Sequence, residues 1–248
     1  MRIALVGSNG HIGHALVNFL KRIDKMKIIE ISRSTGEYLL ELSNPESFEY
    51  SILDNVDYVI FTSCVVNQDR FAFEYEFCYK INVMGTVYFI KEALQRNCRV
   101  IFFSSDAVYG NEIGTIYDEN SETNAVTAYG KMKKIVEDTF KEYSNFKTVR
   151  LSYVISNSDK FTLYLMKCIY NHTAADIYHP FYRNVITMND VSKCIVWLLN
   201  HWDDFYSRAL CISGYDLVSR LRIADELNRI CEQRLRYNIY SISRSRFF

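Results

Sequence analysis

Short apolar runs alternate with stretches in which apolar residues recur at helical spacing. Each run is rich in β-branched or aromatic residues and is followed by polar or glycine-containing residues, which is typical of strands. The runs that we interpret as strands cover residues 2–6, 27–31, 38–42, 57–61, 99–103 and 147–151. Helical spacing covers residues 12–20, a stretch that starts at Pro45, residues 71–96 and residues 124–143. Strands and helices that alternate in this way predict an α/β fold with a parallel, doubly wound sheet.

After residue 155 the alternation becomes less regular. We predict helices over 160–170, 189–200 and 219–232, an extended segment over 176–187 and a strand over 209–213. These elements are too few for a large independent core. We therefore predict a main domain over residues 1–155 and a small C-terminal lobe over residues 156–248, partly interleaved with the main sheet.

Gly7, Gly10 and Gly13 lie between the first predicted strand and the first predicted helix. In this context Gly7 permits a sharp turn, Gly10 lets the backbone approach a pyrophosphate, and Gly13 lets the helix pack closely on the strand. The N–H groups and the positive dipole end of the helix would then face the anion. The first strand, the glycine turn and the first helix therefore predict that the main domain is a dinucleotide-binding Rossmann domain.

Composition narrows the class of protein. The chain has 29 basic and 29 acidic residues and a formal net charge of zero, so no bulk field favours nucleic acid or an anionic membrane. No apolar run approaches the ~20 residues of a membrane span, and Met1 leads directly into the first strand, so we expect no signal peptide. The seven cysteines are scattered without a C-x-x-C pair, which indicates free thiols, no zinc site and a cytoplasmic, reducing location.

Tyr129 and Lys133 are four residues apart on a predicted helix and therefore lie on one face of it. A phenol has an ordinary pKa of about 10, which is too high for efficient acid–base catalysis at neutral pH. A neighbouring ammonium group favours the phenolate and lowers that pKa. Ser105, directly after the fifth predicted strand, could hold a substrate carbonyl by a hydrogen bond. We interpret these residues as a candidate catalytic group.

Several motifs together resemble those of the extended short-chain dehydrogenase/reductases, the NAD(P)-dependent epimerase/dehydratase family. They are the three-glycine turn, residues 82–86 (NVMGT), residues 104–110 (SSDAVYG), the Tyr129/Lys133 pair and residues 183–191 (RNVITMNDV). Within this family the chain is most similar to nucleotide-sugar reductases of the dTDP-4-dehydrorhamnose reductase type. The resemblance implies that Tyr129 is the general acid/base, that Lys133 lowers its pKa and binds the nicotinamide ribose, and that Ser105 polarises the substrate.

The resemblance also implies a set of binding residues. Residues expected to bind the cofactor are Gly7, Asn9, Gly10, His11, Ile12, Gly13, Ser32, Arg33, Ser34, Glu41, Leu42, Ser63, Cys64, Val65, Asn82, Ser104, Tyr129 and Lys133. Ser105, Asp106 and Arg183 are expected to bind the substrate, with the Arg183 guanidinium on the diphosphate of a nucleotide sugar. We expect no metal site.

Two details distinguish between members of the family. The second strand ends in Ser32, Arg33 and Ser34, where an NAD-selective acidic residue is usual. A cation and two hydroxyls suit a 2′-phosphate, so we favour NADP(H) over NAD(H). Asp106 is followed by Ala107, whereas the dehydratases carry an Asp-Glu pair at this point, so dehydration is disfavoured.

The sequence-based hypothesis is an NADPH-dependent reductase of a 4-keto-deoxy nucleotide sugar in surface-polysaccharide synthesis. A nucleotide-sugar epimerase that retains NAD, a non-catalytic NADP-binding protein and a reductase of a small carbonyl compound are the alternatives. The resemblance suggests a homodimer through the helices near 71–96 and 124–143. Residues 234–248 mix Arg with aromatic residues, and a subunit contact, a solvated terminus and a weak anion contact remain open for them.

Overall fold

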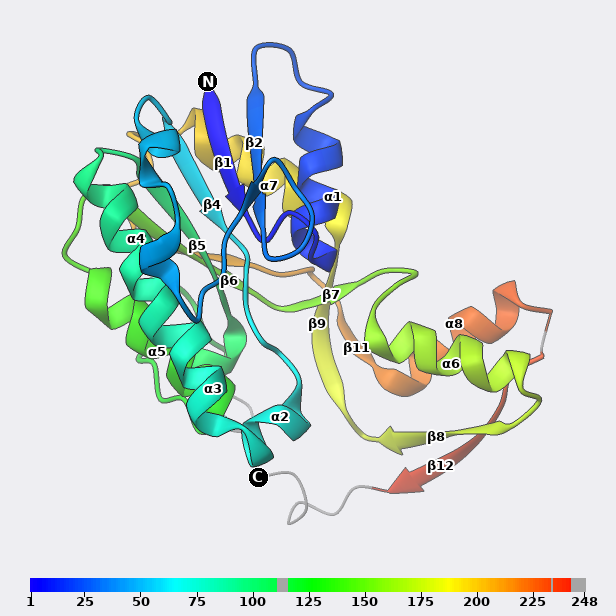
Figure 1. Cartoon of the computed structure of the whole chain (residues 1–248). Coiled ribbons are helices and arrows are strands. Elements are labelled where there is room, and N and C mark those ends of the chain that lie inside the picture. The colour runs from blue at the N-terminus through cyan, green and yellow to red at the C-terminus, as the bar shows by residue number, and fades with distance from the viewer. Residues whose placement is uncertain (111–115, 233, 242–248) are drawn as a thin grey trace. The chain divides into compact units, whose positions relative to one another are not determined.

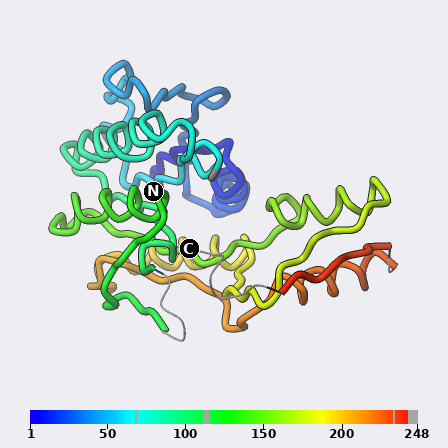
Figure 2. The backbone as a smooth tube through the Cα atoms, turned by 90° about the horizontal axis from the view of Figure 1, so that it is seen from below, coloured from blue at the N-terminus to red at the C-terminus, as the bar shows by residue number. Residues whose placement is uncertain are grey.

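The computed structural model describes residues 1–110, 116–232 and 234–241. They form two compact units, the first made of residues 1–151 and 191–212, the second of residues 152–190 and 213–248. The chain thus leaves the first unit after the sixth strand and returns to it before the second unit is completed. Figure 2 shows this course along the backbone.

A seven-stranded sheet in the order β10-β6-β5-β4-β1-β2-β3 forms the centre of the first unit (Figure 1). Its strands are β1 (Arg2–Val6), β2 (Lys27–Ser32), β3 (Tyr38–Leu39), β4 (Tyr58–Phe61), β5 (Arg99–Ser105), β6 (Phe146–Leu151) and β10 (Ala209–Ile212). Every neighbouring pair is parallel. The predicted doubly wound parallel sheet is confirmed, and the strand order reverses between β1 and β4, where folds of this kind bind their ligands.

Helices cover both faces of this sheet (Figure 1). On one face lie α4 (Thr86–Gln95) and α5 (Ala128–Phe140), and on the other lie α1 (His11–Leu20) and α7 (Met188–Asn200). Because both faces are covered, β4 is buried along its whole length. Phe61 and Phe102 from the sheet and Phe89 from α4 pack in one buried cluster.

The stretch predicted to be helical over 71–96 is helical with one interruption, and it consists of four segments. They are α2 (Gln68–Phe73), α3 (Tyr75–Tyr79), a π-helical turn (Lys80–Gly85) and α4. The break after α2 is at Glu74, whose backbone leaves the helical region at φ −131° and ψ 41°. At Gly85 the helix meets another segment so closely that a Cβ atom would lie 1.9 Å from the Leu42 carbonyl oxygen. This contact joins two segments that are distant in sequence, so helical periodicity alone does not predict it.

Other boundaries differ less from the predictions. The predicted strand over 38–42 is limited to Tyr38–Leu39, and the stretch from Pro45 forms two short 3₁₀ turns, Pro45–Ser47 and Tyr50–Leu53. The helix predicted over 124–143 is α5, which begins after the Thr127 cap. Between β5 and α5, residues 111–115 lie outside the described residues.

The second unit contains two small sheets and two helices. The sheets are β11-β9-β7 and β12-β8. Their strands are β7 (Tyr153–Ile155), β8 (Ala174–His179), β9 (Tyr182–Thr187), β11 (Leu217–Ser219) and β12 (Arg236–Ser241), and the helices are α6 (Lys160–Tyr170) and α8 (Arg220–Ile230). A core of its own packs Leu165, Ile177 and Ala224 together.

The segment predicted to be extended over 176–187 is extended as two strands, β8 and β9, which are separated at Pro180, a residue that has no N–H to donate to a ladder. In the tail, whose role the sequence left open, residues 236–241 form β12, which pairs in parallel with β8 from Arg236 opposite Ala174 to Ser241 opposite His179 (Figure 2). Residues 242–248 lie outside the described residues.

Candidate active site

The turn between β1 and α1 has the geometry that a dinucleotide site requires. Gly7 has φ +90°, and its N–H donates to the Ile31 carbonyl oxygen at 2.8 Å. A Cβ atom at Gly13 would lie 2.0 Å from the Gly7 carbonyl oxygen, so only glycine allows this approach of helix and strand. Gly10 occupies the N-cap of α1 without a side-chain cap, and His11 and Ile12 are the first helical residues. The residues present fit a pyrophosphate at this helix start.

The turn at the end of β2 combines one buried residue, Ser32, with an exposed rim. Asn9 Nδ2 donates to Ser32 Oγ at 2.9 Å and to the Thr35 carbonyl oxygen at 2.6 Å, and Ser32 also donates to that carbonyl. Arg33 and Ser34 are exposed. Asn9 and Ser32 therefore brace the turn, while Arg33 and Ser34 are the residues that a 2′-phosphate could reach. The sequence analysis missed Thr35, since its role depends on how this turn closes.

The turn after β4 is held by a buried amide. Asn82, in the π-helical turn, accepts a hydrogen bond from the Val65 N–H at 2.8 Å and donates to the Val65 carbonyl oxygen at 2.9 Å. Asn82 thus fixes the backbone of half-buried residues Ser63, Cys64 and Val65, and its amide is used by this contact.

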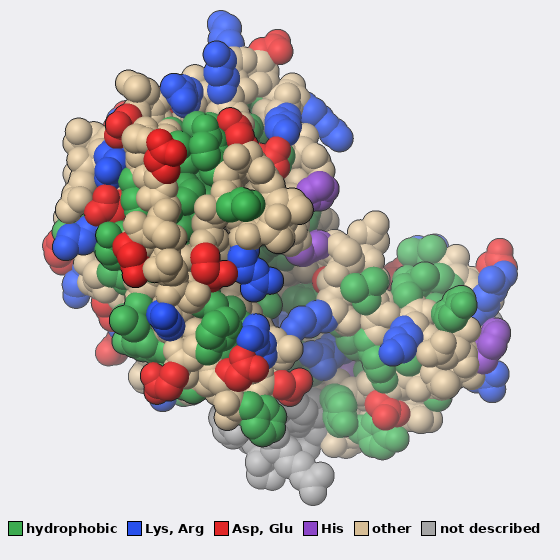
Figure 3. Space-filling view, viewed as in Figure 1, with side chains coloured by type: hydrophobic (Ala, Val, Ile, Leu, Met, Phe, Trp, Pro, Cys, Tyr) green, Lys and Arg blue, Asp and Glu red, His purple; other side chains and the backbone are tan. Residues whose placement is uncertain are grey.

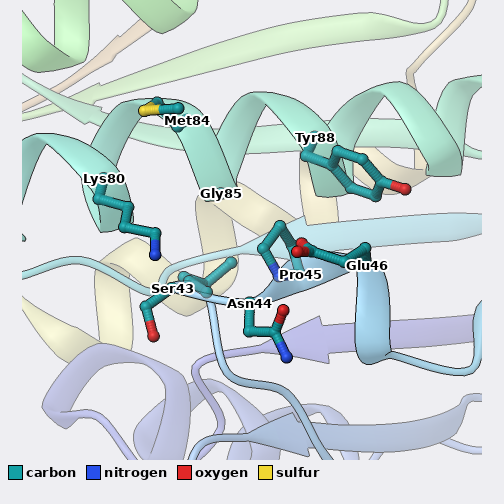
Figure 4. Close-up of a pocket in the computed structure, with 9 residues that line it drawn as sticks. Ser43, Asn44, Pro45, Glu46, Lys80, Met84, Gly85 and Tyr88 are labelled. Atoms are coloured by element: carbon teal, nitrogen blue, oxygen red, sulfur yellow. The ribbon is translucent and has the colours of Figure 1, made fainter.

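Glu41 and Leu42 occupy different surroundings. Glu41 is exposed and accepts from the Ser43 N–H at 3.1 Å, whereas Leu42 is buried and lines a groove of about 460 Å³. Residues 42–46 form one side of this groove, and Lys80, Met84, Gly85 and Tyr88 form the other (Figure 4). None of the other predicted site residues lines it.

The catalytic candidates lie at the carboxyl end of β5 and the start of α5. Ser105 ends β5, and its Oγ donates to Asp106 Oδ1 at 3.0 Å. The start of α5 is capped by Thr127, whose Oγ1 accepts from the Gly130 N–H at 3.0 Å. A Cβ atom at Gly130 would lie 2.3 Å from the Ala107 carbonyl oxygen, so the helix that carries Tyr129 packs directly on the turn after Ser105.

Lys133 is 3% exposed and is held at a defined position. Its Nζ donates to the Phe103 carbonyl oxygen at 2.7 Å and lies 4.5 Å from the Phe102 ring centroid and 5.8 Å from that of Tyr129. The Tyr129 ring in turn packs against Phe71, with ring centroids 6.2 Å apart. The structure therefore brings Tyr129 and Lys133 together.

The pKa of Tyr129 is raised well above its ordinary value, which differs from the expectation. Burial is the main cause, and the neighbouring Cys64 thiol and Asp106 carboxylate act in the same direction. The lowering that we predicted from Lys133 is not observed, because its ammonium is directed to the Phe103 carbonyl and the Cys64 thiol. Burial raises the pKa of Cys64 as well, with Lys133 opposing that rise.

Ser104 adds an observation that fits a bound ligand. The residue is buried beside the site, and its Oγ makes no hydrogen bond within the described part of the chain. A buried hydroxyl without a partner is costly, so a ligand atom that completes its bonding would be favoured. Arg183, the other predicted ligand residue, lies on β9 in the second unit, and its role stays a prediction.

A buried polar network next to Ser105 was not found from the sequence. Arg150 on β6 pairs with Glu137 on α5 at 2.7 Å and donates to the Tyr109 hydroxyl at 2.8 Å. That hydroxyl donates to the Asp118 carbonyl oxygen at 2.7 Å and contacts Cys211 Sγ at 2.9 Å. Its members come from four separate parts of the chain, so no local pattern joins them.

Comparison with protein families gives the assignment. The chain matches the family described as the RmlD substrate binding domain over residues 1–247. The chain belongs to this family. It shares 23% identity over 134 residues with a dTDP-4-dehydrorhamnose reductase of Aggregatibacter actinomycetemcomitans, covering 53% of this chain and 44% of that protein. It shares 26% identity over 156 residues with a UDP-glucose 4-epimerase of Mycoplasma genitalium, covering 55% of this chain and 46% of that protein. The matches thus span less than half the length of both relatives.

Solved structures share the fold over nearly the whole chain. A dTDP-4-dehydrorhamnose reductase of Clostridium acetobutylicum superposes with a TM-score of 0.85 at 18% identity, covering 97% of this chain and 84% of that one. A UDP-glucuronic acid 4-epimerase of Bacillus cereus in complex with NAD gives a TM-score of 0.83 at 17% identity, covering 97% and 86%. The Rossmann-like α/β fold is therefore confirmed.

Proposed function

We propose that this family member is an NADPH-dependent reductase of a 4-keto-deoxy nucleotide sugar and acts in surface-polysaccharide synthesis in the cytoplasm. The observation that carries the proposal is the placement of Tyr129 and Lys133 beside the carboxyl end of β5, at the sheet edge that also carries the glycine turn. The reductases among its relatives support the substrate class.

Different residues of the chain would bind different parts of the cofactor. The glycine turn and the start of α1 would hold the pyrophosphate, Arg33 and Ser34 would hold a 2′-phosphate, and Ser104 would donate its unused hydrogen bond. When bound, NADPH supplies the hydride. The exposed guanidinium of Arg33 is the reason that we favour NADPH over NADH.

Tyr129 would donate its proton to the oxygen of the keto group as that oxygen becomes an alkoxide. Its raised pKa keeps the phenol protonated at neutral pH, which suits a proton donor. Ser105 would hold the same oxygen by a hydrogen bond, and the Ser105–Asp106 contact orients its hydroxyl. Lys133 would fix the position of the site through the Phe103 carbonyl and bind the nicotinamide ribose.

The proposal is tested by mixing the protein with NADPH, or with NADH, and a panel of nucleotide-linked 4-keto-6-deoxy sugars while following the loss of reduced nicotinamide. We expect consumption with one sugar and a preference for NADPH that disappears in Arg33→Gln. Consumption of neither cofactor with any sugar would reject the reductase.

A retained-NAD epimerase is the second candidate, since epimerases of nucleotide sugars are also among the relatives. Stoichiometric NAD that copurifies with the protein, together with interconversion of a sugar without net cofactor use, would favour it. Loose cofactor binding without any turnover would favour a non-catalytic NADP-binding protein instead.

A further inference from the structure

Arg220 occupies an unusual position at the start of α8 in the second unit. Its guanidinium carbon lies 4.6 Å from the centroid of the Phe181 ring and 5.1 Å from that of Phe161. Its backbone N–H donates to the Phe181 carbonyl oxygen at 3.2 Å, which fixes the residue beside β9. The side chain is half-buried, and among the described residues it forms no ion pair with a carboxylate. A desolvated cation is therefore held between two rings without a counter-charge.

The carboxylate at the start of α6, the helix that carries Phe161, is already used. Asp159 caps α6 and accepts hydrogen bonds from the N–H groups of Phe161 at 2.9 Å and Thr162 at 3.1 Å. It also accepts from the Thr162 hydroxyl at 2.6 Å, the Ser156 N–H at 3.1 Å and the Tyr153 hydroxyl. These donors occupy both carboxylate oxygens, so Asp159 serves the helix start and the Tyr153 hydroxyl.

A second guanidinium is close to the first. Arg183 on β9 is opposite Val218 on β11, two residues before Arg220. Burial lowers the pKa of the Arg220 guanidinium, and the charge of Arg183 acts in the same direction. Both arginines also act on the Tyr153 phenol, since each opposes the rise in its pKa that burial and Asp159 cause. Tyr153, Arg183 and Arg220 therefore form one local electrostatic group.

We propose that Arg220 is an anion-binding residue that acts beside Arg183 and contacts the phosphoryl oxygens of the nucleotide-sugar diphosphate. The identity of this ligand rests on the proposed function. A guanidinium presents its N–H donors in a planar fork that matches two phosphoryl oxygens, and the Phe161 and Phe181 rings flank the guanidinium of Arg220. The diphosphate would supply the counter-charge that no described residue supplies to Arg220.

The test measures binding of dTDP and of UDP to the full chain by calorimetry. Arg220→Gln removes the charge, and Arg222→Gln is the matched control, because Arg222 lies on the same helix and is exposed. A hydrogen bond to a charged group contributes about 1.5–3 kcal/mol, so we expect Arg220→Gln to weaken diphosphate binding about tenfold or more. We expect Arg222→Gln to leave it unchanged and Arg220→Lys to be intermediate, because an ammonium keeps the charge but not the fork.

NADPH affinity and thermal unfolding of each variant report whether the chain still folds. Equal diphosphate affinity in Arg220→Gln and in the unmodified protein overturns the inference, as does failure of the unmodified protein to bind either diphosphate. The inference is also overturned if Arg220→Gln, Arg220→Lys and Arg222→Gln all lose the same amount of diphosphate affinity. Diphosphate binding that depends on Arg220, without NADPH consumption with any sugar, supports the inference and rejects the reductase. Sugar reduction that is unchanged in Arg220→Gln supports the reductase and rejects the inference.

Discussion

Tyr129 and Lys133 carry the proposed chemistry, and their surroundings differ. Lys133 is nearly buried, and its Nζ donates a hydrogen bond to the Phe103 carbonyl oxygen and faces the Phe102 ring. The Tyr129 ring packs against Phe71 and lies 5.8 Å from Lys133 Nζ, while burial, Cys64 and Asp106 all raise the pKa of its phenol. The pair therefore places a fixed lysine beside a phenol that stays protonated at neutral pH.

Replacing Tyr129 by Phe is expected to lower kcat about 10²- to 10⁴-fold, the usual contribution of a positioned general acid. The NADPH dissociation constant and the unfolding midpoint should change little, because the ring and its contact with Phe71 remain. Single-turnover kinetics and fluorescence titration measure the two effects separately. Near-normal turnover in this variant would contradict the assignment of Tyr129.

The pH dependence of reduction follows from the raised pKa of Tyr129. A phenol donates its proton only below its pKa, so the acid form is present at neutral pH and is lost as pH rises through the raised value. We therefore expect kcat to show no fall from Tyr129 between about pH 6 and pH 9. A fall centred near neutral pH that is absent in Tyr129→Phe would show instead that the phenol is ionised in the working complex.

At the scale of elements, α5 is fixed at both ends to segments that are distant in sequence. Gly130 approaches the Ala107 carbonyl near its start, and Glu137 pairs with Arg150 of β6 near its end. The Arg150 guanidinium also lies 4.9 Å from the Tyr109 ring centroid and so connects the helix to the loop after Ser105. This network positions the helix of Tyr129 against the strand of Ser105.

Arg150→Met is expected to lower the free energy of unfolding by about 3–5 kcal/mol, because it leaves the Glu137 carboxylate buried without its partner. The side chains of this pair are 10% and 8% exposed. Lys134→Met is the matched control on the same helix, since its pair with Asp138 is 32% and 49% exposed and contributes about 0–1 kcal/mol. Urea unfolding measures both. Equal losses in the two variants would show that the buried network has no special role.

At the scale of the whole molecule, the surface carries mixed charge and exposed apolar side chains on several helices. Lys and Arg are interspersed with Asp and Glu over the face seen in Figure 3, and no helix within the described ranges is long and apolar enough to cross a membrane. On the helical face formed by α3, the π-helical turn and α4, the side chains of Tyr75, Met84 and Tyr88 are exposed. Exposed apolar side chains of this kind are typical of a protein interface.

We expect the protein to be a homodimer that uses this helical face, as the sequence resemblance suggested. Met84 is 58% exposed, so Met84→Glu should convert the dimer to a monomer without unfolding the chain. Leu39→Glu is the control, since Leu39 is 63% exposed on β3 and lies outside the helices. Sedimentation velocity gives the outcome. An unmodified protein that is monomeric, or a Met84→Glu variant that stays dimeric, would contradict this prediction.

Local sequence was sufficient wherever a feature depends on neighbouring residues. Helix α6 begins and ends at the predicted residues, because Asp159 caps its start and apolar residues recur at helical spacing. The strand–glycine–helix unit was also predictable, since the close approach that Gly13 allows is to the Gly7 carbonyl oxygen in the same turn. The alternation of strands and helices then predicted a parallel sheet, and the position of Ser105 after a strand predicted that it lies at the carboxyl edge of that sheet.

Contacts between distant segments decided the rest. The helical stretch over 71–96 is interrupted at Glu74 and passes Leu42 closely at Gly85, and residues 236–241 form a strand because they pair with β8. The direction in which Lys133 points, and hence the pKa of Tyr129, depends on the Phe103 carbonyl and on burial. Sequence determined which residues stand at the candidate site, whereas tertiary structure determined their protonation, because desolvation and charge act through space and not along the chain.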